Sequence, residues 1–135
     1  MMSHNGRTIL LLDGLFLSLI GFGQTINSFI GYKFALGGYK ILNELTFASL
    51  GIFEMNFMIG LIGVILVYAS RTEKKKTFWL TISILVHSFI VLSNIIFWSD
   101  VFVVNGAQFT GKIVTLLHIF LALISFYNVK LQRNH

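Results

Sequence analysis

The stretch LTFASLGIFEMNFMIGLIGVILVYAS (Leu45–Ser70) carries a single formal charge, at Glu54. A helix rises about 1.5 Å per residue, so a stretch of this length crosses a hydrocarbon core of about 30 Å. An acidic side chain at the centre of a spanning helix costs roughly 2.5–3.5 kcal/mol. The stretch therefore predicts a membrane span in which Glu54 needs a partner or a function.

The composition of the whole chain also indicates a membrane protein. Of the 135 residues, 56% are hydrophobic and 11% are charged, whereas globular domains are about 45–50% apolar and about 25% charged. The chain has no cysteine, which excludes a disulfide, a thiolate metal site and dithiol chemistry within it. In a membrane protein, the net charge of +5 indicates orientation and contact with anionic lipid rather than nucleic acid.

Four apolar segments predict a single all-α membrane domain, folded as an up-down four-helix bundle. The expected spans cover approximately Thr8–Ile30, Leu45–Ser70, Thr77–Ser99 and Phe109–Val129. The first connector, Gly31–Glu44, contains apolar and aromatic residues and is predicted to be amphipathic, lying in the extracytoplasmic interface. Trp79 and Trp98, near the two ends of the third segment, fit an aromatic belt.

The basic residues are divided unequally between the two sides of the membrane that four spans define. One side holds seven of them: Arg7, Arg71, Lys74, Lys75, Lys76, Lys130 and Arg133. The other side holds Lys33, Lys40 and Lys112. Because positively charged loops stay in the cytoplasm, we expect a multi-pass protein of the plasma (inner) membrane with both termini cytoplasmic.

Small residues recur at helical spacing in three of the spans. Helices associate in a bilayer through such residues and through interhelical hydrogen bonds. The predicted packing faces are Gly14, Ser18 and Gly21 in the first span, Asn56, Gly60 and Gly63 in the second, and Gly111, Ala122 and Ser125, on the side of His118, in the fourth.

Polar residues within the spans form the candidate functional cluster. Asp13, Gln24 and Ser28 share one face of the first span, and Ser83, His87 and Asn94 share one face of the third. Counted from the span ends, Glu54, His87 and His118 lie near the midplane, with Gln24 and Asn94 further out. The predicted cluster is Glu54, His118, His87, Asn94 and Gln24, with Asp13 as a secondary member nearer the cytoplasm.

Each member of this cluster also has a purely structural interpretation. Asp13 is shallow enough to be a solvated carboxylate, the histidines can be neutral and hydrogen-bonded, and Asn94 and Gln24 can join helices. Glu54 is the strongest functional candidate, because lone carboxylates inside membranes are usually functional. No catalytic residue is identified.

The cofactor predictions follow from the same residues. Two histidines facing each other can ligate a haem, and a carboxylate with two imidazoles is a common set of metal ligands. No short-range ligand spacing supports a metal site, and none is predicted. No cofactor is predicted either, with haem and quinone left as alternatives.

The first half of the chain resembles the DoxX-like family of small four-span membrane proteins. The resemblance is carried by GLFLSLIGFGQ (Gly14–Gln24), the connector, LGIFEMNFMIGLIGVIL with Glu54, and the basic turn RTEKKK. Gln24 stands where family members often have lysine. The family is associated with quinone-linked oxidoreductase complexes and stress-related membrane assemblies. The resemblance therefore implies an accessory role and a functional position at Glu54.

Three functions agree with these patterns. The first is an accessory membrane protein, not a stand-alone enzyme, that binds an apolar or quinone-like ligand, with Glu54 and His118 at the polar end of the pocket. The second is a structural subunit or homo-oligomer without a ligand. The third is a proton-coupled transporter of a small solute that uses Glu54 and His87 as a relay.

Overall fold

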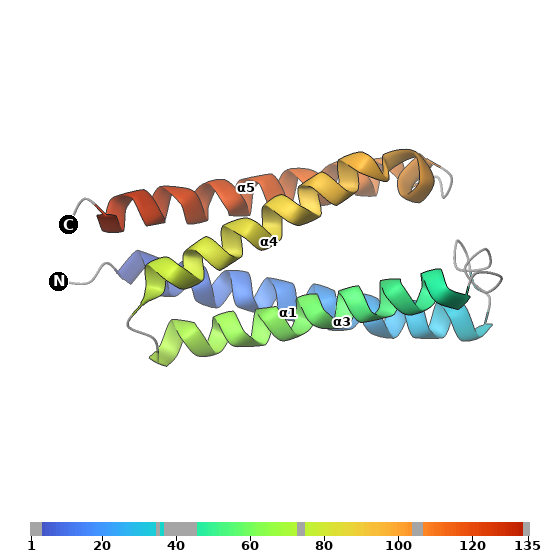
Figure 1. Cartoon of the computed structure of the whole chain (residues 1–135), viewed down its shortest axis with the longest axis horizontal. Helices are drawn as coiled ribbons and strands as arrows, with labels where there is room; N and C mark the ends of the chain where they lie inside the picture. The colour runs from blue at the N-terminus through green and yellow to red at the C-terminus, as the bar shows by residue number, and fades with distance from the viewer. Residues whose placement is uncertain (1–3, 35, 37–45, 73–74, 104–106, 134–135) are drawn as a thin grey trace. The chain divides into compact units, whose positions relative to one another are not determined.

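The computed structural model describes residues 4–34, 36, 46–72, 75–103 and 107–133. In these residues the regular structure is entirely helical: α1 (His4–Phe34), α3 (Thr46–Thr72), α4 (Lys76–Ile96), the π-helix η1 (Trp98–Val103) and α5 (Gln108–Arg133) (Figure 1). Four of these helices are long and apolar enough to cross a membrane. The predictions of an all-helical chain and of a multi-pass membrane protein are confirmed at this level. The predicted amphipathic connector lies mostly outside the described residues.

The end of α4 differs from the predicted span. The sequence predicts an apolar segment that continues to Ser99, but α4 ends at Ile96 and the next helical residues adopt π geometry from Trp98. The Trp98 and Phe102 rings lie 4.9 Å apart across this wide turn. The Phe102 ring covers Gly111 of α5, where an added Cβ would lie 2.6 Å from it. The π-turn thus places an aromatic side chain on the start of the next helix.

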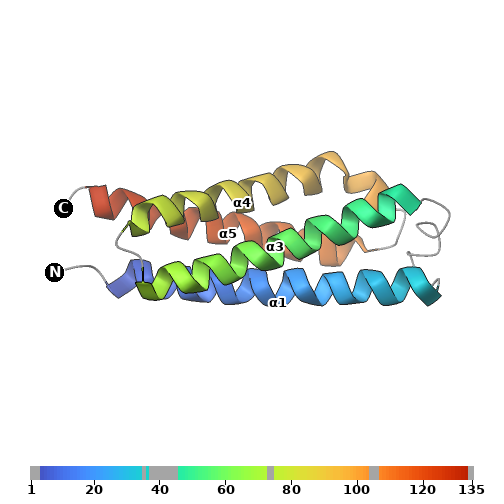
Figure 2. The same ribbon diagram turned by 60° about the horizontal axis from the view of Figure 1, so that its bottom comes forward.

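The described residues divide into two compact units, and the first consists of residues 11–68. Here α1 and α3 run side by side in opposite directions (Figure 2). A Cβ added to Gly14 would lie 2.7 Å from the Gly63 carbonyl oxygen, and one added to Gly21 would lie 2.7 Å from that of Asn56. The backbones therefore approach closely where the sequence predicted packing faces, and this prediction is confirmed.

The second unit consists of residues 1–10 and 69–135. It contains α4, η1, α5, the start of α1 and the end of α3. α4 and α5 form an antiparallel pair, because Thr77 near the start of α4 bonds to Gln132 near the end of α5. The start of α1 joins the same end, since Gly6 lies directly against the Gln132 side chain. Arg7, Lys76 and Lys130 thus lie toward one end of this unit.

Candidate functional site

Polar side chains connect α4 and α5 along their whole shared length. The 3.6-residue period of a helix places Ser83, His87 and Asn94 on one side of α4, and each of them contacts α5. The predicted shared face is therefore confirmed. We call the set the α4–α5 polar seam; its members are Thr77, Ser83, His87 and Asn94 on α4 and Thr115, His118, Ser125 and Gln132 on α5.

The centre of the seam is a hydrogen bond between two imidazole rings. The Nδ1 atoms of His87 and His118 lie 2.7 Å apart, and the ring centroids are 4.9 Å apart. His87 is fully buried and His118 is 3% exposed. A bond between two Nδ1 atoms needs one N–H donor and one lone pair, so at least one ring is neutral. The pair thus holds one proton between its helices, and which ring donates depends on the tautomer.

Hydroxyl and amide pairs continue the seam on both sides of the histidines. The Ser83 and Ser125 hydroxyls lie 3.0 Å apart and are buried. On the other side, the Asn94 side-chain amide donates to the Thr115 hydroxyl at 3.0 Å. Hydrogen bonds of this kind join helices where hydrophobicity cannot.

The seam is saturated with hydrogen bonds. Among the described residues, no buried side-chain nitrogen or oxygen lacks a hydrogen-bond partner. In the same residues, no group of three or more His, Asp or Glu side chains is arranged to hold a metal ion. This geometry is that of a polar joint between two helices, with interactions directed inward.

Glu54 has a different environment, within the unit of residues 11–68. It is the ninth residue of α3 (Thr46–Thr72) and its side chain is exposed. Met55 and Met58 beside it are also exposed, by 47% and 55%. The only cation among the described side chains of this unit is Lys33, in the last turn of α1. Glu54 therefore faces outward, within an apolar surface.

Gln24 is the other exposed member of the predicted cluster in this unit. The ring centroids of Phe22 on α1 and Phe57 on α3 are 5.7 Å apart. Because the two helices are antiparallel, positions two or three residues after Phe22 lie at about the same level along the helix axes as positions two or three residues before Phe57. Gln24 therefore lies within one helical turn of the level of Glu54. Its side-chain oxygen accepts a long hydrogen bond of 3.5 Å from Asn27.

The remaining predicted residue, Asp13, is buried. Its side chain is 1% exposed, which excludes the solvated carboxylate interpretation within this structure. The predicted cluster is thus distributed: His87, His118 and Asn94 belong to the seam, whereas Gln24 and Glu54 belong to the unit of residues 11–68.

An apolar groove follows the exposed side of α4 and α5. It has a volume of about 370 Å³ and is lined by Ser88, Val91, Leu92, Ile95, Ile119, Ala122 and Leu123. Ser88 is the one polar side chain in this lining. We call it the α4–α5 groove.

Several partners in the seam are not identified by sequence reasoning. Gln132 lies beyond the predicted fourth span, which ends at Val129, yet it is on α5 and accepts a hydrogen bond from Thr77. Thr115 lies one turn before His118 on α5, and Asn94 lies two turns after His87 on α4. If His87 is assumed to face His118 on antiparallel helices, Thr115 becomes a candidate partner for Asn94, and this was the one signal in the sequence for that bond. The chain matches no protein-family model, no curated protein and no solved structure.

Proposed function

We propose that this chain is a non-catalytic structural protein of the membrane that assembles with further copies of itself. The observation that carries the proposal is the exposed Glu54 on a helix apolar enough to span a membrane. The hydrogen bonds of the seam support a structural role for the other unit. The resemblance to DoxX-like proteins, which are associated with membrane assemblies, agrees with this role.

An exposed carboxylate within a span favours association with another helix. At a helix centre an acidic residue costs roughly 2.5–3.5 kcal/mol in lipid, and less near the ends. A hydrogen-bond donor from a neighbouring chain would offset part of this cost. By the register of the Phe22–Phe57 contact, Lys33 lies about two turns beyond Glu54 on the neighbouring helix, so it is not at the level of the carboxylate.

A second copy of the chain offers the matching donor. Copies inserted in the same orientation place equal residues at equal depth, so only residues at one level can meet across an interface. Gln24 and Glu54 are both exposed and lie within one turn of each other in height. We therefore assign Gln24 of one copy as the amide donor to Glu54 of the next.

Replacing Glu54 with leucine tests this assignment. We expect Glu54→Leu to weaken self-association at least ten-fold, or about 1.4 kcal/mol, because the acceptor is lost. Glu54→Gln should retain part of the affinity, since an amide oxygen still accepts a hydrogen bond. The measurement is the dimer fraction in vesicles, by energy transfer between labelled copies at decreasing protein-to-lipid ratio.

The matched control is Met58→Leu, one turn along the same face of α3. It changes the apolar contact and leaves the carboxylate in place. Self-association equal to that of the unmodified chain is expected. If Glu54→Leu associates as well as Met58→Leu, the carboxylate has no part in assembly.

The α4–α5 groove favours a second candidate function, the binding of an apolar or quinone-like ligand. Its lining is aliphatic apart from Ser88, whose hydroxyl can donate to a ring carbonyl. Pockets for such ligands combine apolar walls with few polar groups. An isoprenoid chain would lie along Leu92 and Leu123, both of which are exposed.

Filling the groove tests this second candidate. We expect Ala122→Phe to lower the affinity for a short-chain isoprenoid benzoquinone at least ten-fold, since the ring would occupy the ligand's volume. Equilibrium dialysis of the detergent-purified chain measures the affinity. Leu116→Phe, on an exposed part of α5 outside the groove lining, is the control. Equal binding by the two variants would refute a ligand site in the groove.

A further inference from the structure

Three helix ends meet at Gln132. Its side-chain oxygen accepts a hydrogen bond of 2.7 Å from the Thr77 hydroxyl at the start of α4, and its side-chain nitrogen lies against Gly6 near the start of α1. All three residues belong to the unit of residues 1–10 and 69–135. The contact therefore defines one end of this unit.

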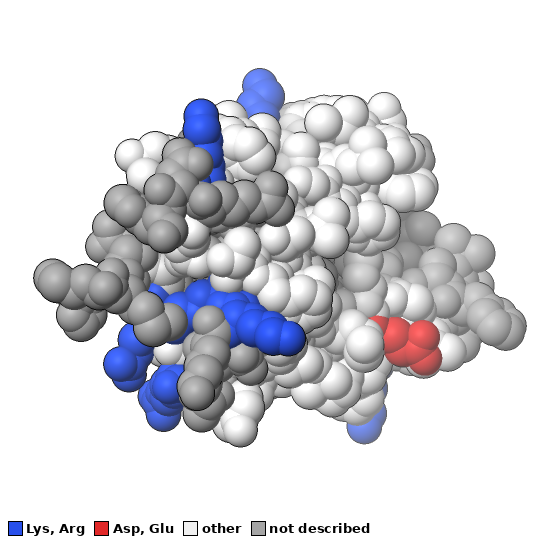
Figure 3. Space-filling view, turned by 60° about the vertical axis from the view of Figure 1, so that its left-hand side comes forward, with Lys and Arg blue, Asp and Glu red and all other residues white. Residues whose placement is uncertain are grey.

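Basic side chains surround this end. We call them the basic end: Arg7, Arg71, Lys75, Lys76 and Lys130. Lys76 is partly exposed and the other four are exposed. Figure 3, which brings this end of the chain forward, shows Lys and Arg side chains gathered there. All charged side chains that the structure describes in this unit are basic.

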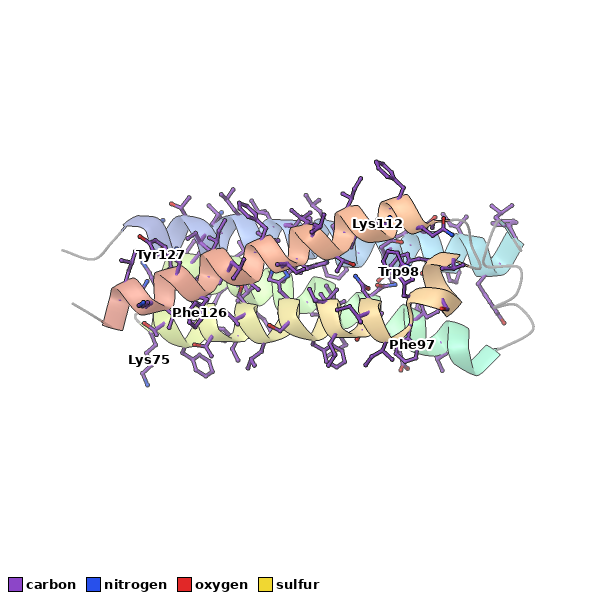
Figure 4. All side chains as sticks on the ribbon, turned by 90° about the horizontal axis from the view of Figure 1, so that it is seen from above. Lys75, Phe97, Trp98, Lys112, Phe126 and Tyr127 are labelled. Atoms are coloured by element: carbon purple, nitrogen blue, oxygen red, sulfur yellow. The ribbon has the colours of Figure 1, made fainter. Side chains whose placement is uncertain are left out.

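Aromatic side chains lie next to the basic end along the helices. Phe78 follows Lys75 and Lys76 on α4, and Phe126 and Tyr127 precede Lys130 on α5; all three aromatic side chains are more than half exposed. Figure 4 shows Lys75, Phe126 and Tyr127 toward the same end of the α4–α5 pair, with Lys112 toward the other. In a phospholipid the charged headgroup is next to the acyl chains, so cationic side chains could contact the headgroup while the neighbouring aromatic rings contact the upper part of the acyl chains.

We propose that the basic end binds the phosphate headgroup of an anionic phospholipid. Clusters of four to eight basic residues next to a membrane span attract anionic lipid headgroups. The five side chains come from α1, α3, α4 and its preceding turn, and α5. The expected cytoplasmic location of this end would place it at the leaflet that carries anionic lipid. The proposal is independent of self-association and of the α4–α5 groove.

The test compares lipid retention by two sets of variants of the full chain. Each protein is placed in nanodiscs of phosphatidylcholine and phosphatidylglycerol, extracted in mild detergent, and its retained lipids are counted by native mass spectrometry. We expect the unmodified chain to favour phosphatidylglycerol. The combined variant Arg71→Gln, Lys75→Gln, Lys76→Gln should lose this preference at least five-fold, and high salt should reduce it in the unmodified chain.

The control is the pair Lys33→Gln and Lys112→Gln, which removes exposed charge away from the basic end. It should keep the preference. At matched ionic strength, inorganic phosphate should displace no more lipid than chloride does, because a free ion lacks the acyl chains that would lie along the aromatic rings. If the combined variant fails to fold, single Lys75→Gln and Lys130→Gln variants should each lower the preference. An unchanged preference in the basic-end variants, equal loss in the control, or greater displacement by phosphate than by chloride would overturn the proposal.

Discussion

Replacing His118 with leucine is expected to destabilise the α4–α5 pair by about 2 kcal/mol, because His87 then loses its imidazole partner in a buried position. The two Nδ1 atoms are 2.7 Å apart and neither ring has appreciable exposure. His87→Leu should have a similar effect. The double variant should be more stable than the sum of the single effects predicts, because it removes both polar partners together.

This double-mutant cycle isolates the bond between the rings from the other contacts that each imidazole makes. We expect a coupling of about 1–2 kcal/mol, at the upper end of what hydrogen bonds within membranes provide. Equilibrium unfolding of the chain in mixed detergent micelles measures it. Leu116→Ala on an exposed part of α5 is the control for loss of apolar volume. Strictly additive single effects would show that the two rings are not coupled.

Adding a methyl group at Gly21 is expected to disrupt the α1–α3 pair. The Cβ of Gly21→Ala would lie 2.7 Å from the Asn56 carbonyl oxygen and closer still to the Gly60 nitrogen. Both atoms are backbone, so the helices themselves must separate. We expect a loss of about 2–3 kcal/mol, which equilibrium unfolding in the same micelles measures.

Gly23 offers a matched control two residues further along α1. A Cβ at Gly23 would meet no atom within 4 Å. Alanine has the higher helix propensity, so Gly23→Ala should leave stability unchanged or raise it by up to about 1 kcal/mol. If Gly21→Ala and Gly23→Ala behave alike, close backbone approach does not hold α1 to α3.

The sequence was sufficient to predict the four long helices and the packing faces of α1 and α3. An apolar run of about 20 residues has few structural options in a membrane, and helical period alone put Gly14, Ser18 and Gly21 on one face. The partner face, Gly60 and Gly63, was found in the same way. The π-helix after Ile96 was not predicted, because hydropathy and helical period do not distinguish π-helical from α-helical hydrogen bonding over a few residues.

The candidate site was predicted only in part. Ser83, His87 and Asn94 were assigned correctly to one face because they lie on a single helix. Their partners on α5 depend on the register between two helices, which helical periodicity does not supply. Glu54 was expected to point into a pocket with His118, yet its side chain is exposed on α3 and the Nδ1 of His118 lies 2.7 Å from that of His87.

The assembly of copies through Glu54 and Gln24 is tested most directly by disulfide trapping, for which a cysteine-free chain is well suited. Ile20 and Met58 lie one turn from Gln24 and Glu54 on the same helix faces, and both are exposed. Differently tagged chains carrying Ile20→Cys and Met58→Cys are mixed in vesicles and oxidised. Because the cysteines replace Ile20 and Met58, the Glu54 carboxylate and the Gln24 amide stay in place.

We expect a mixed disulfide between Ile20→Cys and Met58→Cys chains that disappears when Glu54→Leu is added. Leu12→Cys is equally suited to labelling, since Leu12 is 60% exposed, but it lies about two turns from Ile20 along α1 and should not react with Met58→Cys. Equal trapping with Ile20→Cys and Leu12→Cys, or no trapping with either, would contradict an interface at this level of the membrane.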